Sequence, residues 1–274
     1  MLKNKKTTIG VLGCGWLGLP LAKKLLAEGC RVHGTTSRLE KIDLLEKAGI
    51  KPHLVSCKED DCTSVRPFLK VVDVVVVTIP PGLRTKPNRR FDTLIETLIQ
   101  ELVSCAVAQV IFISSTSVYG NQTGLLNETT PTKPVSESGK QLVKSEQLLL
   151  KTIDFQTTVI RFGGLIGPDR HPIFSLTKKA SIPNPRGKIN MIHLTDCINM
   201  ISSCIQQSKG NTIYNGVSPY HPERGRYYRE MAKMAGVSCP PFEQTEGIDR
   251  RISAKKIQSE LNFNFSVENL LTLN

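Results

Sequence analysis

The stretch TTIGVLGCGWLG, residues 7–18, decides the fold. Its first half is apolar and has the length of a short buried strand, the glycines Gly13, Gly15 and Gly18 follow, and a helical apolar pattern starts at Leu17. The first glycine makes a tight turn, the second lets backbone N–H groups approach a pyrophosphate, and the third allows close helix–strand packing. The N-terminus of the helix would then face the anion. A strand, a glycine turn and a helix in this order predict a dinucleotide-binding unit.

The same alternation of strand and helix continues beyond this unit. Short apolar runs predict strands at residues 7–12, 30–35, 51–57, 73–79, 109–114 and 157–161, and helical periods predict helices at 17–28, 39–48, 91–106 and 138–152. The four valines at 74–77 are apolar on both faces, as a central parallel strand covered by helices must be. We therefore expect an α/β fold, a Rossmann-type doubly wound parallel sheet.

The pattern loosens in the last third of the chain. Prolines become frequent after Gly167, and only short helices are expected, near residues 196–207 and 226–235. Residues 1–166 are expected to form an NAD(P)-binding Rossmann domain, and residues 167–274 a smaller substrate-binding lobe interleaved with it. Ligands of open α/β sheets bind at the carboxyl ends of the strands, so the lobe should cover that edge.

Composition and charge limit the kinds of partner that we expect the protein to bind. The chain is 39% hydrophobic and 22% charged, and no apolar run approaches the roughly 20 residues of a membrane span. The basic start leads into an apolar run too short for a secretory signal, so we expect a cytoplasmic protein without a membrane partner. The net charge of +12 is spread along the chain without a basic arm, which favours an anionic small ligand over nucleic acid.

Eight cysteines are scattered through the sequence, at positions 14, 30, 57, 62, 105, 197, 204 and 239. They form no CxxC pair and no His/Cys cluster at zinc spacing. We therefore expect no bound metal, and reduced, largely buried cysteines that pack as small apolar residues.

The end of the second expected strand suggests which dinucleotide binds. An NAD enzyme usually places Asp or Glu there to bond the ribose hydroxyls, whereas this chain has Thr35, Thr36, Ser37 and Arg38. A 2′-phosphate would find hydroxyls and a guanidinium fork, so NADP(H) is expected as the cofactor, with NAD less favoured. In the alternative interpretation, Arg38 is a solvated residue at a helix start. The expected cofactor-binding residues are Gly13, Gly15, Trp16, Leu17, Gly18, Ser37, Arg38, Ile79, Pro80, Pro81 and Ser114.

Several motifs in order give the chain a family resemblance. They are GCGWLG at 13–18, SSTSVYG at 114–120, RFGGLIGP at 161–168 and NMIHLTD at 190–196. With these motifs the chain resembles the extended short-chain dehydrogenase/reductase family, the NAD-dependent epimerases and dehydratases. The resemblance covers nearly the whole length, because RIS at 251–253 and LNF at 261–263 look like the family's C-terminal signature.

The resemblance implies an active site with a Ser or Thr, a Tyr general acid/base and a Lys four residues later that lowers the tyrosine pKa. The first of these maps onto Ser115. Aligning the segment PVSESGKQLVKSEQ, residues 134–147, on the family's YGxSK and AEQ-like sequences puts Ser138 at the tyrosine position and Leu142 at the lysine position. The chain is therefore expected to be an atypical member that lacks the Tyr–Lys pair.

A shifted register gives Ser136 and Lys140 the same four-residue separation. An alkyl hydroxyl titrates far above a phenol, so a neighbouring ammonium would not make it an equivalent acid/base. The catalytic candidates that remain are Ser115, Ser138 and Lys140.

Other polar residues of these motifs have structural interpretations. Tyr119 is expected to pack, His193 to fix a loop and Asp196 to anchor a helix terminus. Arg161 is expected either to orient the active-site loop or to bind substrate. Four basic residues after the fourth expected strand face either an anionic substrate or solvent: Arg84, Lys86, Arg89 and Arg90.

Two classes of function stay open. One is an NADP(H)-dependent oxidoreductase or epimerase-like enzyme acting on a small molecule that is anionic or sugar-derived. The other is a non-catalytic NADP(H)-binding sensor or regulatory protein, because a fold does not fix a function. A homodimer is suggested only by analogy with the resembled family.

Overall fold

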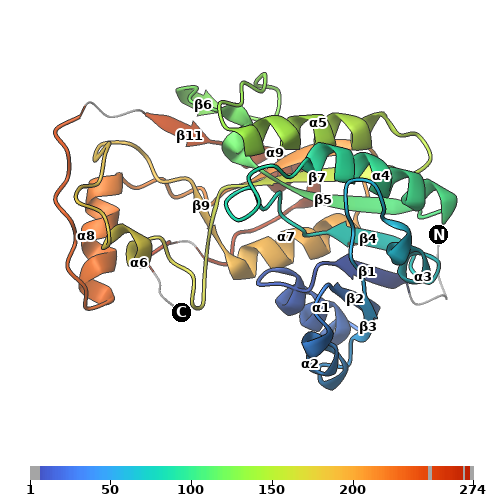
Figure 1. Ribbon diagram of the computed structural model, residues 1–274. Coiled ribbons are helices and arrows are strands. Elements are labelled where there is room, and N and C mark those ends of the chain that lie inside the picture. Colours follow the sequence, from blue (N-terminus) through green and yellow to red (C-terminus); the bar gives the residue numbers. More distant parts are fainter. Residues whose placement is uncertain (1–6, 246–248, 268, 272–274) are drawn as a thin grey trace.

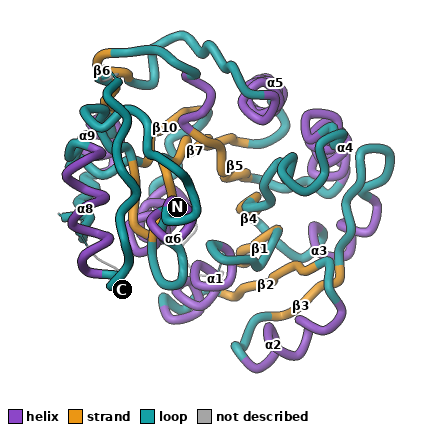
Figure 2. Tube along the Cα trace, turned by 60° about the vertical axis from the view of Figure 1, so that its left-hand side comes forward, coloured by secondary structure: helices purple, strands orange, loops and turns teal. Residues whose placement is uncertain are grey.

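The computed structural model describes residues 7–245, 249–267 and 269–271. A seven-stranded sheet forms its centre, in the order β10-β7-β5-β4-β1-β2-β3, and every neighbouring pair is parallel. Figure 2 shows this order across the sheet, from β10 to β3. The strands are β1 (Thr8–Leu12), β2 (Arg31–Thr36), β3 (Lys51–Leu54), β4 (Val74–Val77), β5 (Gln109–Ser115), β7 (Gln156–Phe162) and β10 (Thr212–Gly216). The expected doubly wound α/β fold is confirmed.

Helices cover both faces of this sheet (Figure 1). On one face lie α3 (Arg66–Leu69), α4 (Phe91–Ser104) and α5 (Glu137–Lys151), and on the other α1 (Gly18–Ala27), α2 (Ile42–Lys47), α7 (Leu194–Gln206) and α9 (Lys255–Leu261). Each layer has its own apolar core against the sheet: Leu94 and Leu98 belong to the first, and Leu21 and Ile198 to the second. Because both faces are covered, β4 is fully buried, as its run of valines predicted.

Three of these elements come from the region expected to form the lobe. β10, α7 and α9 all follow residue 167, yet β10 pairs with β7 and forms the edge of the sheet. β10 was not expected from the sequence, because TIYNG is a short edge strand of five residues without a continuous apolar run. The division between residues 166 and 167 remains a prediction.

The rest of the lobe lies beyond the carboxyl edge of the sheet (Figure 1). It contains α6 (Ile173–Leu176) and α8 (Arg224–Met234), which share a third apolar core. Two small parallel sheets connect it to the main body: β8 (Gly164–Ile166) with β9 (Met191–His193), and β6 (Gly124–Leu126) with β11 (Arg250–Ile252).

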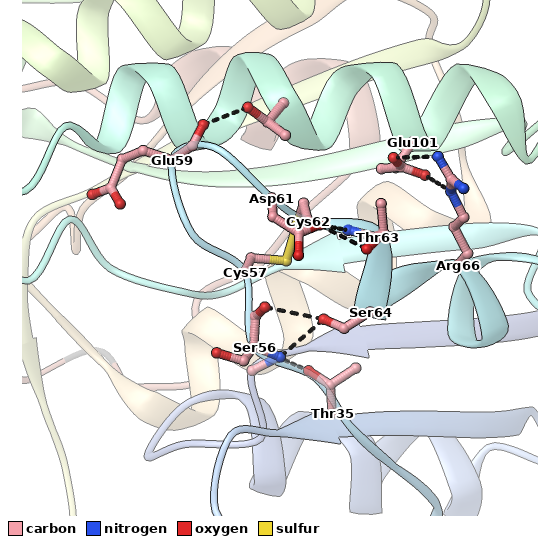
Figure 3. The surroundings of a disulfide bond; sticks show 12 residues. Thr35, Ser56, Cys57, Glu59, Asp61, Cys62, Thr63, Ser64, Arg66 and Glu101 are labelled. Atoms are coloured by element: carbon pink, nitrogen blue, oxygen red, sulfur yellow. Dashed lines mark hydrogen bonds and ion pairs between the residues drawn. A yellow bond between two sulfur atoms is a disulfide. The ribbon is translucent and has the colours of Figure 1, made fainter.

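The loop after β3 corrects the prediction that all cysteines are reduced. Cys57 and Cys62 form a disulfide, with their Cα atoms 4.3 Å apart (Figure 3). The loop turns back on itself, since the Lys58 N–H donates to the Asp61 carbonyl at 2.9 Å, and this turn brings together two side chains whose spacing matched no known pattern. The other six cysteines are free, and burial raises the pKa of the Cys204 thiol to about 12.

The described ranges lack two further features, a membrane-spanning helix and a cluster of metal-binding side chains. None of the helices there is long and apolar enough to cross a membrane. The same ranges hold no group of three or more His, Cys, Asp or Glu side chains that could bind a metal ion.

Candidate cofactor and substrate site

A cavity of about 530 Å³ opens at the carboxyl ends of β1, β2, β4 and β5. Every residue that the sequence indicated for cofactor binding lines it, from the glycine turn to Ser114. Thr35 and Thr36, from the strand end that the sequence indicated for the 2′-phosphate, also line the cavity. Six further lining residues were not expected from the sequence: Cys14, Lys41, Thr78, Ile113, Leu165 and Arg170. The elements thus bring the expected cofactor residues together in one place, at the edge where open α/β sheets bind ligands.

The glycine turn has the geometry that a pyrophosphate requires. Gly13 has φ of 106°, in the region that favours glycine, and its N–H donates to Thr35 Oγ1 at 2.9 Å. A Cβ on Gly18 would overlap the carbonyl oxygen of Gly13, so the close start of α1 needs a glycine there. A Cβ on Gly15 would meet no heavy atom within 4 Å. The turn therefore leaves space for a ligand beside Gly15, whereas at Gly18 the helix packs directly on the backbone of Gly13.

The helix that follows adds a favourable field. α1 has no acidic residue in its first turn and no side-chain hydrogen bond at its N-cap, Leu17. Its N-terminal partial positive charge faces the cavity without competition from a carboxylate. The residues present therefore fit the phosphates of a dinucleotide.

The far end of the cavity, after β2, is basic. Ser37, Arg38 and Lys41 line it, and the part of the chain that the structure describes contributes no Asp or Glu to its wall. The Arg38 N–H donates to Thr36 Oγ1 at 3.1 Å, which holds the turn between β2 and the following 3₁₀ helix, Leu39–Lys41. Lys41 is the last residue of that 3₁₀ helix and lines the same wall as Arg38. A second basic residue so close to Arg38 was the signal in the sequence that could have indicated it.

Ser115 ends β5 and lines the same cavity. Its Oγ accepts a hydrogen bond from the Ser117 N–H at 3.1 Å, so its own proton can be donated to another group. Of the three catalytic candidates, Ser115 alone lines the cavity.

Below this strand end lies a buried polar network. Ser114 Oγ donates to Glu146 Oε1 at 2.5 Å, and Glu146 pairs with Arg161, whose Nη2 lies 2.6 Å from Oε2. Arg161 Nη1 donates to the Tyr119 hydroxyl at 3.0 Å, and that hydroxyl donates to Asn215 Oδ1 at 2.9 Å. The network thus connects β5, β7 and β10 through α5 and the turn after β5.

Electrostatics give this network a structural role. Burial raises the pKa of Tyr119, which keeps its phenol protonated, and Tyr119 is not among the lining residues. Burial opposes the charge of Arg161, but the hydrogen bonds and charge of Glu146 outweigh it and raise the arginine pKa. Arg161 therefore stays charged and is bonded to Glu146, which also bonds Ser114, the neighbour of Ser115 on β5. Both expected roles of Arg161, orienting the active-site loop and binding substrate, remain predictions.

α5 places the other two catalytic candidates outside the cavity. Ser138 is half-buried, Lys140 has a side chain 57% exposed with its Nζ 3.8 Å from Glu137 Oε2, and neither is a lining residue. Leu142, by contrast, is buried and lines the cavity. Ser136 caps α5 by accepting a hydrogen bond from the Gly139 N–H at 3.1 Å. The structure therefore does not place Ser138 or Lys140 in the wall of the cavity that Ser115 lines.

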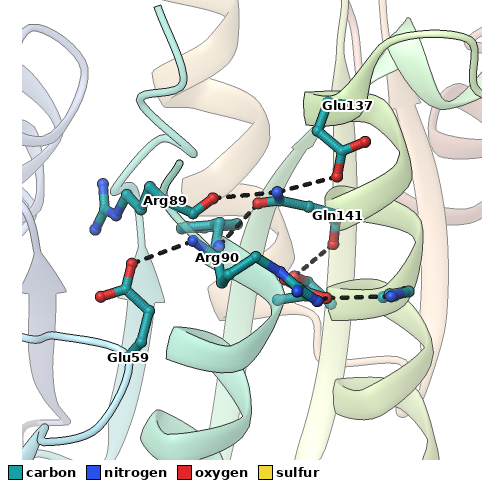
Figure 4. A network of polar contacts seen from close by, with 9 residues as sticks. Glu59, Arg89, Arg90, Glu137 and Gln141 are labelled. Carbon is teal, nitrogen blue, oxygen red and sulfur yellow. Dashed lines mark hydrogen bonds and ion pairs between the residues drawn. The ribbon is translucent and has the colours of Figure 1, made fainter. Parts of the chain in front are cut away.

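Two arginines of the basic loop after β4 make internal contacts (Figure 4). Arg89 Nη1 donates to the Pro81 carbonyl at 3.3 Å, and Gln141 Nε2 on α5 donates to the Arg89 carbonyl at 3.1 Å. Arg90 pairs with Asp92, which also pairs with Lys144 at 3.3 Å. These contacts fix the loop that carries Pro80 and Pro81 against α5.

Two polar residues of the motif at residues 190–196 make contacts within the fold, and it is His193, not the expected Asp196, that caps the helix terminus. His193 is the N-cap of α7, where its Nδ1 accepts a hydrogen bond from the Thr195 N–H at 3.2 Å. Asp196 is fully buried and accepts hydrogen bonds from the Ser266 and Val267 N–H groups, at 2.7 and 3.2 Å. The carboxylate therefore ties the C-terminal segment to α7.

A second, smaller cavity of about 270 Å³ lies between the lobe and the segment that follows Gly120. Lys188, Arg224 and Arg250 line it together with the amides of Asn121, Gln122, Asn184 and Asn190. Its described wall includes no carboxylate, and Arg224 Nε is buried without a hydrogen-bond partner among the described residues. Burial and the charge of Arg224 lower the pKa of Arg250. An anionic group would satisfy both arginines.

The two cavities are adjacent along β8, since Gly164 lines the second and Leu165 the first. The second cavity was not foreseen from the sequence, because its residues come from separate stretches of the chain that only the folded lobe brings together.

A parallel sheet with a glycine turn before α1, a cavity at its carboxyl edge and a small lobe over that edge make up a Rossmann-type dinucleotide-binding architecture. The chain belongs to the NAD-dependent epimerase/dehydratase family, whose model matches residues 9–184. The resemblance inferred from the motifs is thereby confirmed.

Individual relatives agree with this assignment. Protein YeeZ of Escherichia coli strain K12 is 34% identical over 277 residues, which cover 97% of this chain and 98% of that protein. The structure of UDP-glucose 4-epimerase from Thermotoga maritima with UDP-glucose superimposes with a TM-score of 0.81 at 15% identity, covering 97% of both chains. A functionally unknown conserved protein from Silicibacter pomeroyi DSS gives 0.76 at 21% identity, covering 96% of this chain and 95% of that one.

A third structure carries the cofactor named in the family's description. It is dTDP-glucose 4,6-dehydratase from Bacillus anthracis in complex with NAD, with a TM-score of 0.80 at 17% identity, covering 97% of this chain and 94% of that one. At these identities, the solved structures establish the fold that they share with this chain.

Proposed function

We propose that the chain binds NADP(H) in the 530 Å³ cavity and acts there as an oxidoreductase or epimerase-like enzyme on an anionic or sugar-derived small molecule. The observation that carries the proposal is that Ser115, a hydrogen-bond donor, shares one cavity with the glycine turn. The nicotinamide would supply hydride transfer, and the protein would supply orientation and a hydrogen bond.

The preference for NADP(H) rests on the chemistry after β2. Arg38 offers a planar fork for a 2′-phosphate and Lys41 a second charge, whereas a ribose-binding carboxylate is absent from the described wall. NAD is the alternative, favoured by the family's description and by the NAD bound to related structures such as the Bacillus anthracis dehydratase.

Calorimetric titration with NADPH and NADH separates the two cofactors. Arg38→Ala should weaken NADPH binding about 10- to 100-fold, as expected for a lost charge-assisted hydrogen bond, and leave NADH unchanged. Arg226→Ala removes an exposed arginine on α8 that pairs with Glu230, and serves as the charge-matched control. If NADH binds as tightly as NADPH and Arg38→Ala changes neither, the cofactor is NAD.

Ser115 is the residue we assign to the reaction. Its Oγ accepts from the Ser117 N–H, so the hydroxyl proton is available for a substrate oxygen. The buried Glu146–Arg161 pair, bonded to the neighbouring Ser114, keeps this strand end from moving. A fixed donor aimed at the position where negative charge develops lowers a barrier without reorganisation.

An anionic substrate fits the second cavity. Arg224 and Arg250 lack a carboxylate in the described wall and lie next to the first cavity through β8. A phosphate or carboxylate bound there would place the rest of a sugar-sized molecule toward Ser115.

The enzymatic part of the proposal is tested by turnover. NADPH oxidation is followed with a panel of phosphorylated and carboxylated carbonyl sugars, in wild type, Ser115→Ala and the control Ser117→Ala, whose hydroxyl lies outside both cavities. We expect activity that falls at least tenfold in Ser115→Ala and persists in Ser117→Ala. Equal activity in wild type and Ser115→Ala would remove Ser115 from the mechanism.

The second candidate is a non-catalytic NADP(H) sensor. It is favoured by Leu142, an apolar side chain in the cavity wall at the position where the family alignment expects a lysine. Such a protein would bind NADPH tightly and show no turnover with any member of the panel, with or without Ser115.

A further inference from the structure

Trp16, the only tryptophan of the chain, connects the glycine turn to the lobe. Its indole Nε1 donates to the Pro168 carbonyl at 3.1 Å. A Cβ on Gly167 would lie 3.2 Å from Trp16 Cζ2, so the turn after β8 packs tightly on the indole ring. Trp16, within the glycine motif, thus contacts Pro168, which lies 152 residues later in the sequence.

The same turn places Arg170 over the indole. Its guanidinium carbon lies 4.7 Å from the centre of the Trp16 ring, within the range of a cation–π contact. Two backbone hydrogen bonds of 3.0 Å between Gly167 and Arg170 close the turn and limit the positions of this side chain. Arg170 is therefore held against the indole, at the wall of the cavity.

Arg170 has no acidic partner in the described part of the chain. Its side chain lines the cavity beside the glycine turn, and no ion pair with a described carboxylate involves it. Burial and the charge of Arg84, from the loop after β4, lower its pKa. Arg84 does not line the cavity, but its charge acts on Arg170, and an anion beside Arg170 would offset that repulsion.

We propose that Arg170 binds the pyrophosphate of the dinucleotide from the lobe side, opposite the backbone N–H groups of the glycine turn, and that its stacking on Trp16 aims it there. The inference rests on the proposed function, because it assigns a residue to the same cavity. It adds that cofactor binding fastens the lobe to the sheet: a pyrophosphate held by both Gly15 and Arg170 bridges the two.

The chemistry separates this role from that of Arg38. A pyrophosphate is common to NADPH, NADH and ADP-ribose, whereas the 2′-phosphate belongs to NADPH alone. Loss of Arg170 should therefore weaken all three ligands by the same factor, and loss of Arg38 should weaken only NADPH. 2′-AMP carries a 2′-phosphate without a pyrophosphate, so its binding should respond to Arg38 and not to Arg170.

The experiment measures the dissociation constants of these four compounds by calorimetry, and by quenching of Trp16 fluorescence. In Arg170→Ala we expect NADPH, NADH and ADP-ribose to bind about 10- to 100-fold more weakly and 2′-AMP to bind within twofold of wild type. Arg226→Ala should match wild type for all four. If Arg170→Ala is unstable, Arg170→Gln, which keeps a planar polar group against the indole, gives the same comparison.

The possible results are distinguishable. Wild type that binds none of the dinucleotides overturns the proposed function and this inference together. Wild type that binds NADPH, with Arg170→Ala or Arg170→Gln within twofold of it for all ligands, overturns this inference alone. A loss confined to NADPH would place Arg170 on the 2′-phosphate and also overturn it.

Discussion

Replacing Glu146 with glutamine is expected to destabilise the protein by about 3 kcal/mol, although the two side chains have nearly the same shape. Glu146 and Arg161 have side chains only 3% and 5% exposed. The substitution removes the negative charge and leaves a guanidinium buried next to the Tyr119 hydroxyl.

The magnitude follows from the contacts that are lost. Glu146 accepts three hydrogen bonds from Arg161, at 2.6, 3.1 and 3.2 Å, and one from Ser114. Breaking a buried ion pair by removing one partner costs about 3–5 kcal/mol, because the other charge stays desolvated without compensation. The glutamine carbonyl retains part of the hydrogen bonding, so we expect the lower end of this range.

Urea unfolding followed by circular dichroism gives the free energies for a double-mutant cycle. Glu146→Gln and Arg161→Met should each lose about 3 kcal/mol, and the double variant should lose at least 2 kcal/mol less than their sum, since no unpaired charge remains. Glu137→Gln removes the exposed partner of Lys140 and keeps an oxygen that can accept from Gln141 Nε2, so it should change stability by less than about 0.5 kcal/mol. A loss below 1 kcal/mol in Glu146→Gln, or a fully additive double variant, would refute the reasoning.

Three further predictions concern titration, the glycine turn and the disulfide. Burial lowers the pKa of His171 to about 4. Burial and the nearby His53 lower the pKa of His33 to about 4 as well. Below about pH 6.5 the unfolded chain therefore binds protons that the folded chain does not. Stability should therefore be full above pH 6.5 and fall toward pH 4, by about 1–2 kcal/mol for His171 after allowing for solvent screening, and a Tm at pH 5 equal to that at pH 7.5 would contradict this. Gly15→Ala should keep the wild-type Tm, because the added Cβ has open space, and should weaken NADPH binding at least tenfold. Gly18→Ala should lower both the Tm and the affinity for NADPH. An unchanged NADPH affinity in Gly15→Ala would show that the pyrophosphate binds elsewhere. Replacing both Cys57 and Cys62 with serine should cost about 2 kcal/mol, the loop-closure entropy of a short ring, and a change below 0.5 kcal/mol would show that the loop is held without the bond.

Much of the cofactor site was predictable because it depends on local sequence. The glycines of residues 13–18 and the residues that follow β2, β4 and β5 must meet at one edge once neighbouring strands are parallel. Ser115 belongs to this set, since it ends β5. For residues at strand ends, the order of strands and helices along the chain is nearly sufficient to place them at the carboxyl edge of the sheet.

The sequence also allows a prediction of which side chains of α5 are buried, but this prediction was not made for Lys140. Consecutive helical residues are about 100° apart, so Lys140 and Leu142 point to nearly opposite sides. Leu142 shares the buried face with Ser145, Glu146 and Leu149, which leaves Lys140 on the exposed side. Because Leu142 lines the cavity, the helical repeat places Lys140 on the side of α5 that faces away from it.

The remaining features depend on contacts between distant segments. Glu146 is charged, and an acidic residue on a helix is normally solvated, so its buried pairing with Arg161 had no local signal. Arg170 and Arg224 become neighbours of the cavities only through the packing of the lobe on the sheet. Cys57 and Cys62 meet because of a turn whose shape their spacing does not specify.

A crystal structure of the protein grown with saturating NADPH tests the central claim most directly. The account predicts the pyrophosphate between the glycine turn and Arg170, the 2′-phosphate against Arg38, and the nicotinamide facing Ser115. A dinucleotide bound outside this cavity, or a cavity that stays empty at saturating NADPH, would contradict it.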